Sequence, residues 1–206
     1  MGVELRLMKS AHESTAADDR ELIEAIRGGD SDAFELLVRR KTSKVYALCY
    51  RVIGNAEDAK DISQLAFIKV WENVEKYDPA FSFDTWLYRI VTNVAIDFLR
   101  NRQSRDAAVN SNLRLVKRSS DAEQPVTIQR KEIEAVFSDV ASVLSPKQKA
   151  IFVMREMEDI SSAEISRILG CRESTVRNHL FNARKLMQER LKQRYPEYAR
   201  LWREES

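Results

Sequence analysis

Two helical patterns separated by a glycine stand out in the C-terminal third of the chain. Ser161 and Glu164 have the S-x-x-E spacing of a capping box, which marks the start of a helix, and Gly170 stands where a helix end requires a positive φ. Beyond it, apolar residues recur at helical spacing, at Val176, Leu180, Ala183 and Met187. The pattern predicts a helix-turn-helix over residues 161–191, with a second helix able to enter a DNA major groove. The alternative is an ordinary helical hairpin whose charged face is simply solvated.

Three helices are predicted before residue 77. The first begins near Asp18 and ends at Gly28, the second starts at an Asp30 or Ser31 cap and closes at Gly54, and the third opens at Asn55. The third helix has an apolar stripe expected to face inward, formed by Ala59, Ile62, Phe67, Val70, Trp71 and Val74.

A loop over residues 77–84 leads into a long predicted helix over residues 85–102. Aromatic side chains are dense here and alternate with basic ones, a composition typical of single-stranded DNA binding, where bases stack on exposed rings. We expect Trp86, Tyr88 and Phe98 to belong to the core instead. Phe81 and Phe83 lie in the loop, where the sequence leaves burial and exposure open.

Helical periodicity stops over residues 103–127, which are rich in Ser, Asn and Asp. It returns at Ile128, and a strong helix start follows at Ser145 and Pro146. The inward residues of this stretch are expected to be Ile133, Val136, Phe137, Val140 and Leu144. The pattern therefore predicts an all-α protein of two small helical domains joined by a flexible linker, the second domain containing the helix-turn-helix.

Composition limits the possible functions. The chain has 206 residues, two Cys and two His, so the sequence supplies no zinc-binding set, and its two cysteines look like small core residues. We find no membrane-length apolar run and no signal-peptide pattern, which predicts a cytoplasmic protein. No Gly-rich phosphate loop or nucleophile–base pair is recognisable, so neither an enzyme nor a cofactor-binding protein is expected.

Charge is unevenly distributed along the chain, although the formal net charge is only +2. Residues 13–37 hold eight acidic and two basic side chains, whereas residues 89–118 hold seven basic and two acidic ones, and residues 173–192 hold five basic and two acidic ones. Two separate basic segments on an otherwise acidic chain predict two DNA contacts and a different partner for the acidic part.

Three segments in this order resemble one bacterial family. They are AEDAKDISQLAFIKVW (56–71), FDTWLYRIVTNVAIDFLR (83–100), and a third that begins LSPKQKAIFVMREMEDISSAEISRILG and runs over residues 144–187. Together they resemble extracytoplasmic-function sigma factors (group IV of the sigma-70 family), the dissociable promoter-recognition subunits of RNA polymerase. The resemblance implies an alternative sigma factor that directs promoter-specific transcription initiation and is regulated by an anti-sigma factor.

The resemblance also implies an arrangement of domains and a polymerase contact. Residues 19–105 would form the region 2 domain and residues 128–192 the region 4 domain, with 106–127 as linker and 1–18 and 193–206 as tails. The family binds core polymerase at the clamp helices of the largest subunit and at the flap. In this chain the implied clamp contacts are Asp58, Asp61, Gln64 and Phe67.

Two sets of DNA-contacting residues follow from the same resemblance. The implied minus-ten set, which would capture an unpaired base, is Phe83, Asn93, Asp97 and Arg100. The implied minus-thirty-five set on the recognition helix is Thr175, Arg177, Asn178, Phe181, Asn182 and Arg184. The chain has His179 and Asn182 where the family usually carries Arg, which weakens the phosphate contribution and leaves the preferred promoter sequence undetermined.

Two other functions are compatible with parts of the pattern. A sigma-like decoy that only binds an anti-sigma factor would not need the two basic segments. A two-domain repressor would not need the acidic face of the third helix.

Overall fold

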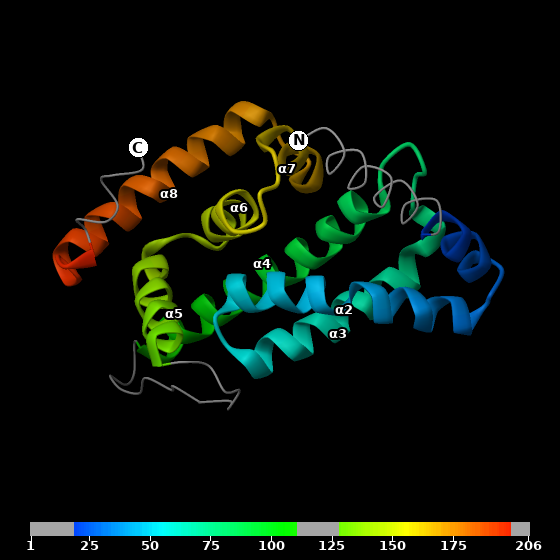
Figure 1. The fold of residues 1–206 in the computed structure, drawn as a ribbon, viewed down its shortest axis with the longest axis horizontal. Helices are drawn as coiled ribbons and strands as arrows, with labels where there is room; N and C mark the ends of the chain where they lie inside the picture. The colour runs from blue at the N-terminus through cyan, green and yellow to red at the C-terminus, as the bar shows by residue number, and fades with distance from the viewer. Residues whose placement is uncertain (1–18, 111–127, 199–206) are drawn as a thin grey trace, which may run out of the picture.

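The structure is a computed structural model that describes residues 19–110 and 128–198, and every regular element in these ranges is helical (Figure 1). The first part holds a short helix over residues 19–27, α2 (Ser31–Ile53), α3 (Ala56–Asn73), the 3₁₀ turn η1 (Val74–Lys76) and α4 (Phe83–Asn110). The second part holds α5 (Ile128–Val140), η2 (Ala141–Val143), α6 (Pro146–Glu156), α7 (Ser162–Leu169) and α8 (Glu173–Arg194). The predicted all-α class with two domains is confirmed.

Helix α4 is longer than predicted at both ends. It begins two residues earlier than expected and continues to Asn110, through the first residues of the expected linker. The remainder of that expected linker, residues 111–127, lies outside the described residues, as do the expected N-terminal tail and residues 199–206.

Local capping explains where the other helices begin. The Asp30 carboxylate accepts hydrogen bonds from the N–H groups of Asp32 and Ala33, and the Asn55 side chain accepts one from the N–H of Asp58. Ser145 and Gln148 form a complete capping box at the start of α6. Gly54 ends α2 with a φ of 80°, a left-handed conformation that favours glycine. The predicted starts of α2, α3 and α6 are therefore confirmed.

Helices α2, α3 and α4 pack against one another around a core formed by the predicted stripes (Figure 1). Leu37, Leu48, Val70 and Val91 are almost fully buried in it. The inward prediction for Trp71 is wrong, because its side chain is 42% exposed and meets the Phe34 ring edge-on at the rim of the core.

The second part of the chain has its own core under α8. Val140, Leu144, Phe152, Met187 and Leu191 are buried together there. The inward prediction for Ile133 is wrong, because this residue is 60% exposed.

The two domains are packed together. The large core continues from the first domain into Ile151, Ile165 and Val176 of the second, and α4 contacts both α6 and α7 (Figure 1). Polar contacts join the same surfaces: Arg51 pairs with Glu158, and the Thr85 hydroxyl donates a hydrogen bond to the Glu164 carboxylate over 3.2 Å.

Candidate polymerase and nucleic-acid interfaces

The outward face of α3 combines acidic and apolar side chains. Asp61 and Gln64 are exposed, and on the same side Leu65 and Ile68 are 40% and 53% exposed. Asp58 is half-buried and accepts a hydrogen bond from Arg102 of α4 over 3.3 Å. Leu65 and Ile68 were not expected at this surface from the sequence, although their spacing from Asp61 places them on its face. This surface suits a partner with both basic and apolar groups.

Phe67, the fourth residue predicted to contact polymerase, does not belong to this surface. It is 8% exposed. At about 100° per residue, position 67 is turned about 120° around the helix from Asp61 but only about 60° from the buried Val70. The Phe67 ring therefore supports α3 from behind and is not available for direct contact in this structure.

A groove of about 950 Å³ lies between α3, the 77–82 loop and α4. Three aromatic rings line it, those of Phe81, Trp86 and Phe98. The amide side chains of Asn73, Asn93 and Asn101 and the cationic ones of Lys69, Lys76, Arg89 and Arg167 line it as well. A surface that binds single-stranded DNA needs rings on which bases stack, amides that contact base edges and cations that contact phosphates.

Two of the four residues predicted for the minus-ten contact, Asn93 and Asp97, line this groove from the exposed side of α4. Arg100 is exposed and lies 3.6 Å from the Asp97 carboxylate, outside the lining residues.

Phe83 is not exposed to the groove. It is 5% exposed and its ring packs against Tyr77 and Trp86, with centroids 5.8 Å from each. The loop ring that reaches the groove is Phe81, which is 48% exposed. The distinction was available in the sequence: Phe83 continues the α4 stripe of Leu87 and Val91 one turn toward the N-terminus, whereas Phe81 precedes the helix.

The helix-turn-helix is confirmed as α7, a turn at Gly170 with φ 60°, and α8. All four predicted inward residues of α8 are buried, and Val176 and Ala183 are completely so. Only half of the predicted capping box forms: Ser161 accepts a hydrogen bond from the Glu164 N–H, while the Glu164 carboxylate accepts one from Thr85 of the first domain.

The residues predicted for the minus-thirty-five contact lie on the open side of α8. Asn178, Asn182 and Phe181 are exposed, and the Phe181 ring is 70% exposed. The same surface includes the half-buried Thr175 and two exposed arginines held in ion pairs of 2.6 Å: Arg177 with Glu173, and Arg184 with Glu156 of α6. Pairs this exposed contribute little to stability, so both arginines can exchange their partners for phosphates at low cost.

His179 supplies no charge to this face at neutral pH. It is half-buried, and burial, with a smaller contribution from the nearby Lys147 charge, lowers its pKa below the ordinary value of 6.5. The imidazole is therefore neutral at pH 7.

Two negative findings concern the described residues alone. None of the helices described is long and apolar enough to cross a membrane. Across residues 19–110 and 128–198, no three His, Cys, Asp or Glu side chains gather in a way that could hold a metal ion.

An acidic and apolar helix face, an aromatic groove and a helix-turn-helix on one chain are typical of a multi-domain DNA-binding protein with a protein partner. Two family models match these parts: sigma-70 region 2 over residues 37–105 and sigma-70 region 4 over residues 137–187. The chain belongs to the sigma-70 family and to its extracytoplasmic-function sigma factors.

Curated relatives agree with this assignment. The chain is 31% identical to the extracytoplasmic-function RNA polymerase sigma factor SigW of Bacillus subtilis, over 84% of this chain and 96% of the relative. It is 32% identical to the RNA polymerase sigma-H factor of Pseudomonas aeruginosa, over 86% of this chain and 95% of the relative.

Solved structures share the fold. CnrH, solved in complex with the cytosolic domain of CnrY, has a TM-score of 0.62 at 22% identity, covering 86% of this chain and 99% of CnrH. The sigma factor RpoE of Bartonella quintana, solved with the anti-sigma factor NepR, has a TM-score of 0.60 at 18% identity, covering 77% of this chain and 96% of that one.

Proposed function

We propose that this chain is an alternative sigma factor that binds cytoplasmic core RNA polymerase and contacts promoter DNA at two places. The observation that carries the proposal is the pairing of a groove lined by rings, amides and cations with a recognition helix whose polar side is open. The groove suits an unpaired strand, and the helix suits a duplex. Family membership supports the same division between region 2 and region 4.

In this proposal the groove captures the melted minus-ten strand. Asn93 reads a base edge, Phe81 offers its ring for stacking, and Arg89 lies on the lining where it can hold phosphate. Asp97 can accept a hydrogen bond from a base. Arg100 contributes charge beside the groove, and Phe83 supports the loop from the core.

The recognition helix reads the minus-thirty-five duplex. Arg177, Asn178 and Asn182 can form the bidentate contacts by which side chains identify bases in the major groove. Thr175, Phe181 and Arg184 complete the contact with methyl groups and phosphates.

The outward face of α3 is the proposed clamp contact. Asp58, Asp61 and Gln64 supply its polar part, and the exposed Leu65 and Ile68 supply apolar area. Charge reversal by Asp61→Arg, combined with Gln64→Ala, should remove core binding and leave the fold intact, because both side chains are exposed. Unchanged affinity for purified core polymerase would contradict this assignment.

Promoter binding requires the two domains to separate. The minus-ten and minus-thirty-five elements are about 25 base pairs apart, or about 85 Å along B-DNA at about 3.4 Å per base pair. Because α7 contacts both α4 and α8, the recognition helix starts only about two helix diameters, roughly 20–25 Å, from α4. Arg167 of α7 also lines the groove. We therefore propose that the packed arrangement is a resting state that opens on polymerase.

An anti-sigma factor is a natural partner for such a resting state. RpoE and CnrH, which share this fold, were solved with partner chains, in the case of RpoE a named anti-sigma factor. We propose that this chain is likewise regulated by one, which would hold the two domains in the packed arrangement.

Run-off transcription tests the proposed function. Purified chain is added to core polymerase with genomic DNA fragments from the source bacterium, and discrete transcripts that depend on the chain are expected. Asp61→Arg with Gln64→Ala serves as the inactive control. Promoter-length DNA bound without core, and no transcript with core, would instead favour a repressor.

A further inference from the structure

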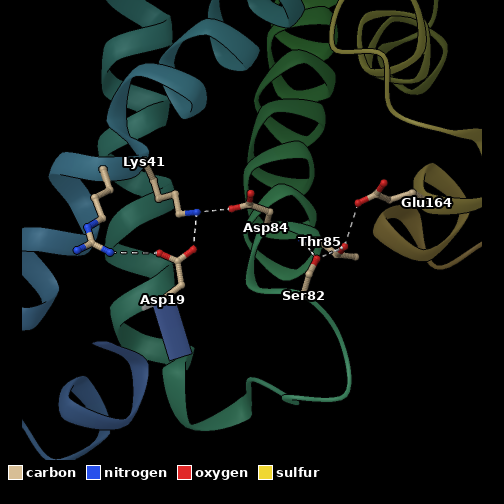
Figure 2. A network of polar contacts seen from close by, with 7 residues as sticks. Asp19, Lys41, Ser82, Asp84, Thr85 and Glu164 are labelled. Carbon is tan, nitrogen blue, oxygen red and sulfur yellow. Dashed lines mark hydrogen bonds and ion pairs between the residues drawn. The ribbon is translucent and has the colours of Figure 1, made fainter. Parts of the chain in front are cut away.

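A buried lysine lies behind the groove, at the point where three helices meet. Lys41 of α2 is 4% exposed, and its Nζ is 2.6 Å from the Asp19 carboxylate and 2.6 Å from the Asp84 carboxylate (Figure 2). The ammonium also lies 5.7 Å from the centroid of the Phe83 ring. A buried charge is costly unless it is paired, and here two carboxylates from different helices pair with it.

Both carboxylates matter to the charge of Lys41. Burial alone would lower its pKa, but the hydrogen bonds and charges of Asp19 and Asp84 outweigh burial and raise the pKa above 10.5. Lys41 therefore stays charged throughout the physiological pH range. Through its two ion pairs it links the 19–27 helix to the N-terminus of α4.

The tie to α4 fixes one end of the 77–82 loop. Asp84 lies in the first turn of α4, where a carboxylate also interacts favourably with the helix dipole. Next to it, Ser82 accepts a hydrogen bond from the Thr85 N–H over 3.2 Å, and the two hydroxyls lie 2.7 Å apart (Figure 2). The loop thus enters α4 through two adjacent polar contacts.

The tie to the 19–27 helix fixes the rest of the loop. Arg20 donates to the Pro79 carbonyl over 3.2 Å, and Arg27 donates to the Tyr77 carbonyl over 2.6 Å. The Tyr77 hydroxyl in turn donates to the Phe81 carbonyl over 2.8 Å. The position of this helix therefore determines where the loop, and with it the Phe81 ring, lies at the groove.

We infer that Lys41 is a positioning residue for minus-ten capture: through Asp19 and Asp84 it fixes the 77–82 loop so that Phe81 faces the groove. Lys41 does not line the groove and would not touch DNA. The inference rests on the proposed function of the groove, but it makes a statement about the loop that can be measured without DNA.

The test separates positioning from stability by removing the charges of Lys41 and of its two carboxylate partners together. Lys41→Met alone removes the shared partner of Asp19 and Asp84 and leaves Asp19 with Arg40, which lies 3.9 Å away. It should destabilise the fold, since a buried charge that loses its near partner is costly. The triple variant Asp19→Asn, Lys41→Met, Asp84→Asn removes these three charges and should recover most of the stability, because removing both sides of an ion pair is far less costly than removing one. Arg40, which also pairs with Asp19, keeps its charge in this variant, but its side chain is 29% exposed and can be solvated. Arg39→Met on the same helix, whose pair with Glu35 is exposed, is the matched control.

Two readouts are compared in the triple variant. Amide hydrogen exchange of Tyr77, Ala80 and Phe81, each of which donates a hydrogen bond within or beside the loop, should be at least fivefold faster, with α8 unchanged. Affinity for labelled single-stranded DNA of ten random nucleotides should fall at least fivefold, with affinity for the same DNA as duplex unchanged. Arg39→Met should leave both within twofold of wild type.

Other results would overturn the inference. If loop exchange in the triple variant stays within twofold of wild type, Lys41 only stabilises the fold. If exchange accelerates but single-strand affinity is retained, the position of the loop does not govern capture. If the loop loosens and wild-type protein itself fails to prefer single strands over duplex, Lys41 still positions the loop, and it is the proposed function of the groove that fails.

Discussion

The two DNA-facing surfaces of this molecule are built in opposite ways. The recognition side of α8 is a row of exposed side chains on a helix whose opposite stripe is buried, and its ion pairs lie at the surface. The groove is assembled from two helices and a loop, and the loop is held by a buried charged cluster and by carbonyl contacts from a third helix. Exposed side chains of α8 should therefore be replaceable with little change in the free energy of unfolding, whereas substitutions at many groove positions should also lower stability.

The two phenylalanines expected from sequence to contact DNA, Phe83 and Phe181, give the largest expected difference in stability. Phe83→Ala empties a buried site between Tyr77 and Trp86 and should lower the free energy of unfolding by about 3–5 kcal/mol. Phe181→Ala removes a ring that is 70% exposed and should change it by less than about 0.5 kcal/mol while weakening duplex binding. Urea unfolding followed by circular dichroism measures both. Equal costs would mean that the two surfaces are not built differently.

A smaller change is expected in the free energy with which the two domains pack together. Burial, with the Arg102 charge as a lesser cause, lowers the pKa of Lys149 to about 8 in the packed arrangement, against about 10.4 for a solvated lysine. The packed form therefore binds fewer protons, so its stability should rise as pH increases from about 8 toward 10. Below that window the charged amine opposes packing. Lys149→Met should strengthen packing at pH 7.5 by on the order of 3 kcal/mol.

The radius of gyration during a urea titration measures the domain separation in this prediction. At pH 7.5 the Lys149→Met variant should separate at a higher urea concentration than wild type. Wild type should approach the variant as pH rises, and the variant itself should respond little. A variant with the same pH response as wild type would show that Lys149 is not the responsible group.

The smallest effect concerns the salt dependence of duplex binding. His179 is neutral at pH 7, so His179→Ala should leave the slope of log affinity against log salt unchanged. Arg184→Ala, which removes a proposed phosphate contact, should reduce that slope by about 1, and His179→Arg should increase it by about 1. Fluorescence anisotropy with one promoter duplex at several salt concentrations measures all three. A reduced slope in His179→Ala would show that the imidazole carries charge against DNA.

Most of the recognition helix could be predicted from sequence, because its information is local. A 3.6-residue period separates Val176, Leu180 and Ala183 from Asn178 and Asn182, and the turn needs only Gly170. The same local logic predicted the starts of α2, α3 and α6.

The groove was only partly predictable for the same reason. Its two helices were expected, and Asn93 and Asp97 lie on its lining. The apolar stripe of α4 would have placed Phe83 in the core, and the angle of Phe67 on α3 would have placed it with the buried Val70. The contacts that hold the loop, in contrast, come from distant parts of the chain. Lys41 lies 43 residues from Asp84, so no short-range pattern links them.

The packing of the domains carries the least sequence signal. Glu164 has the spacing of a capping residue, yet its carboxylate meets Thr85, 79 residues away. Arg51 and Glu158 are 107 residues apart. Helical periodicity predicts each helix and its apolar stripe. It does not predict which of the two hydrophobic cores that stripe will pack into.

The groove is expected to meet DNA only after strand opening, whereas α8 is expected to meet the duplex. Permanganate footprinting of unpaired thymines, run beside a gel shift on one promoter with the polymerase holoenzyme, tests it directly. Asn93→Ala should leave closed-complex affinity nearly intact and impair melting, and a pre-melted bubble should not restore its base preference. Asn182→Ala should instead lose about 1–3 kcal/mol of minus-thirty-five preference without a specific melting defect. Normal melting with unaltered minus-ten preference in Asn93→Ala would contradict the account.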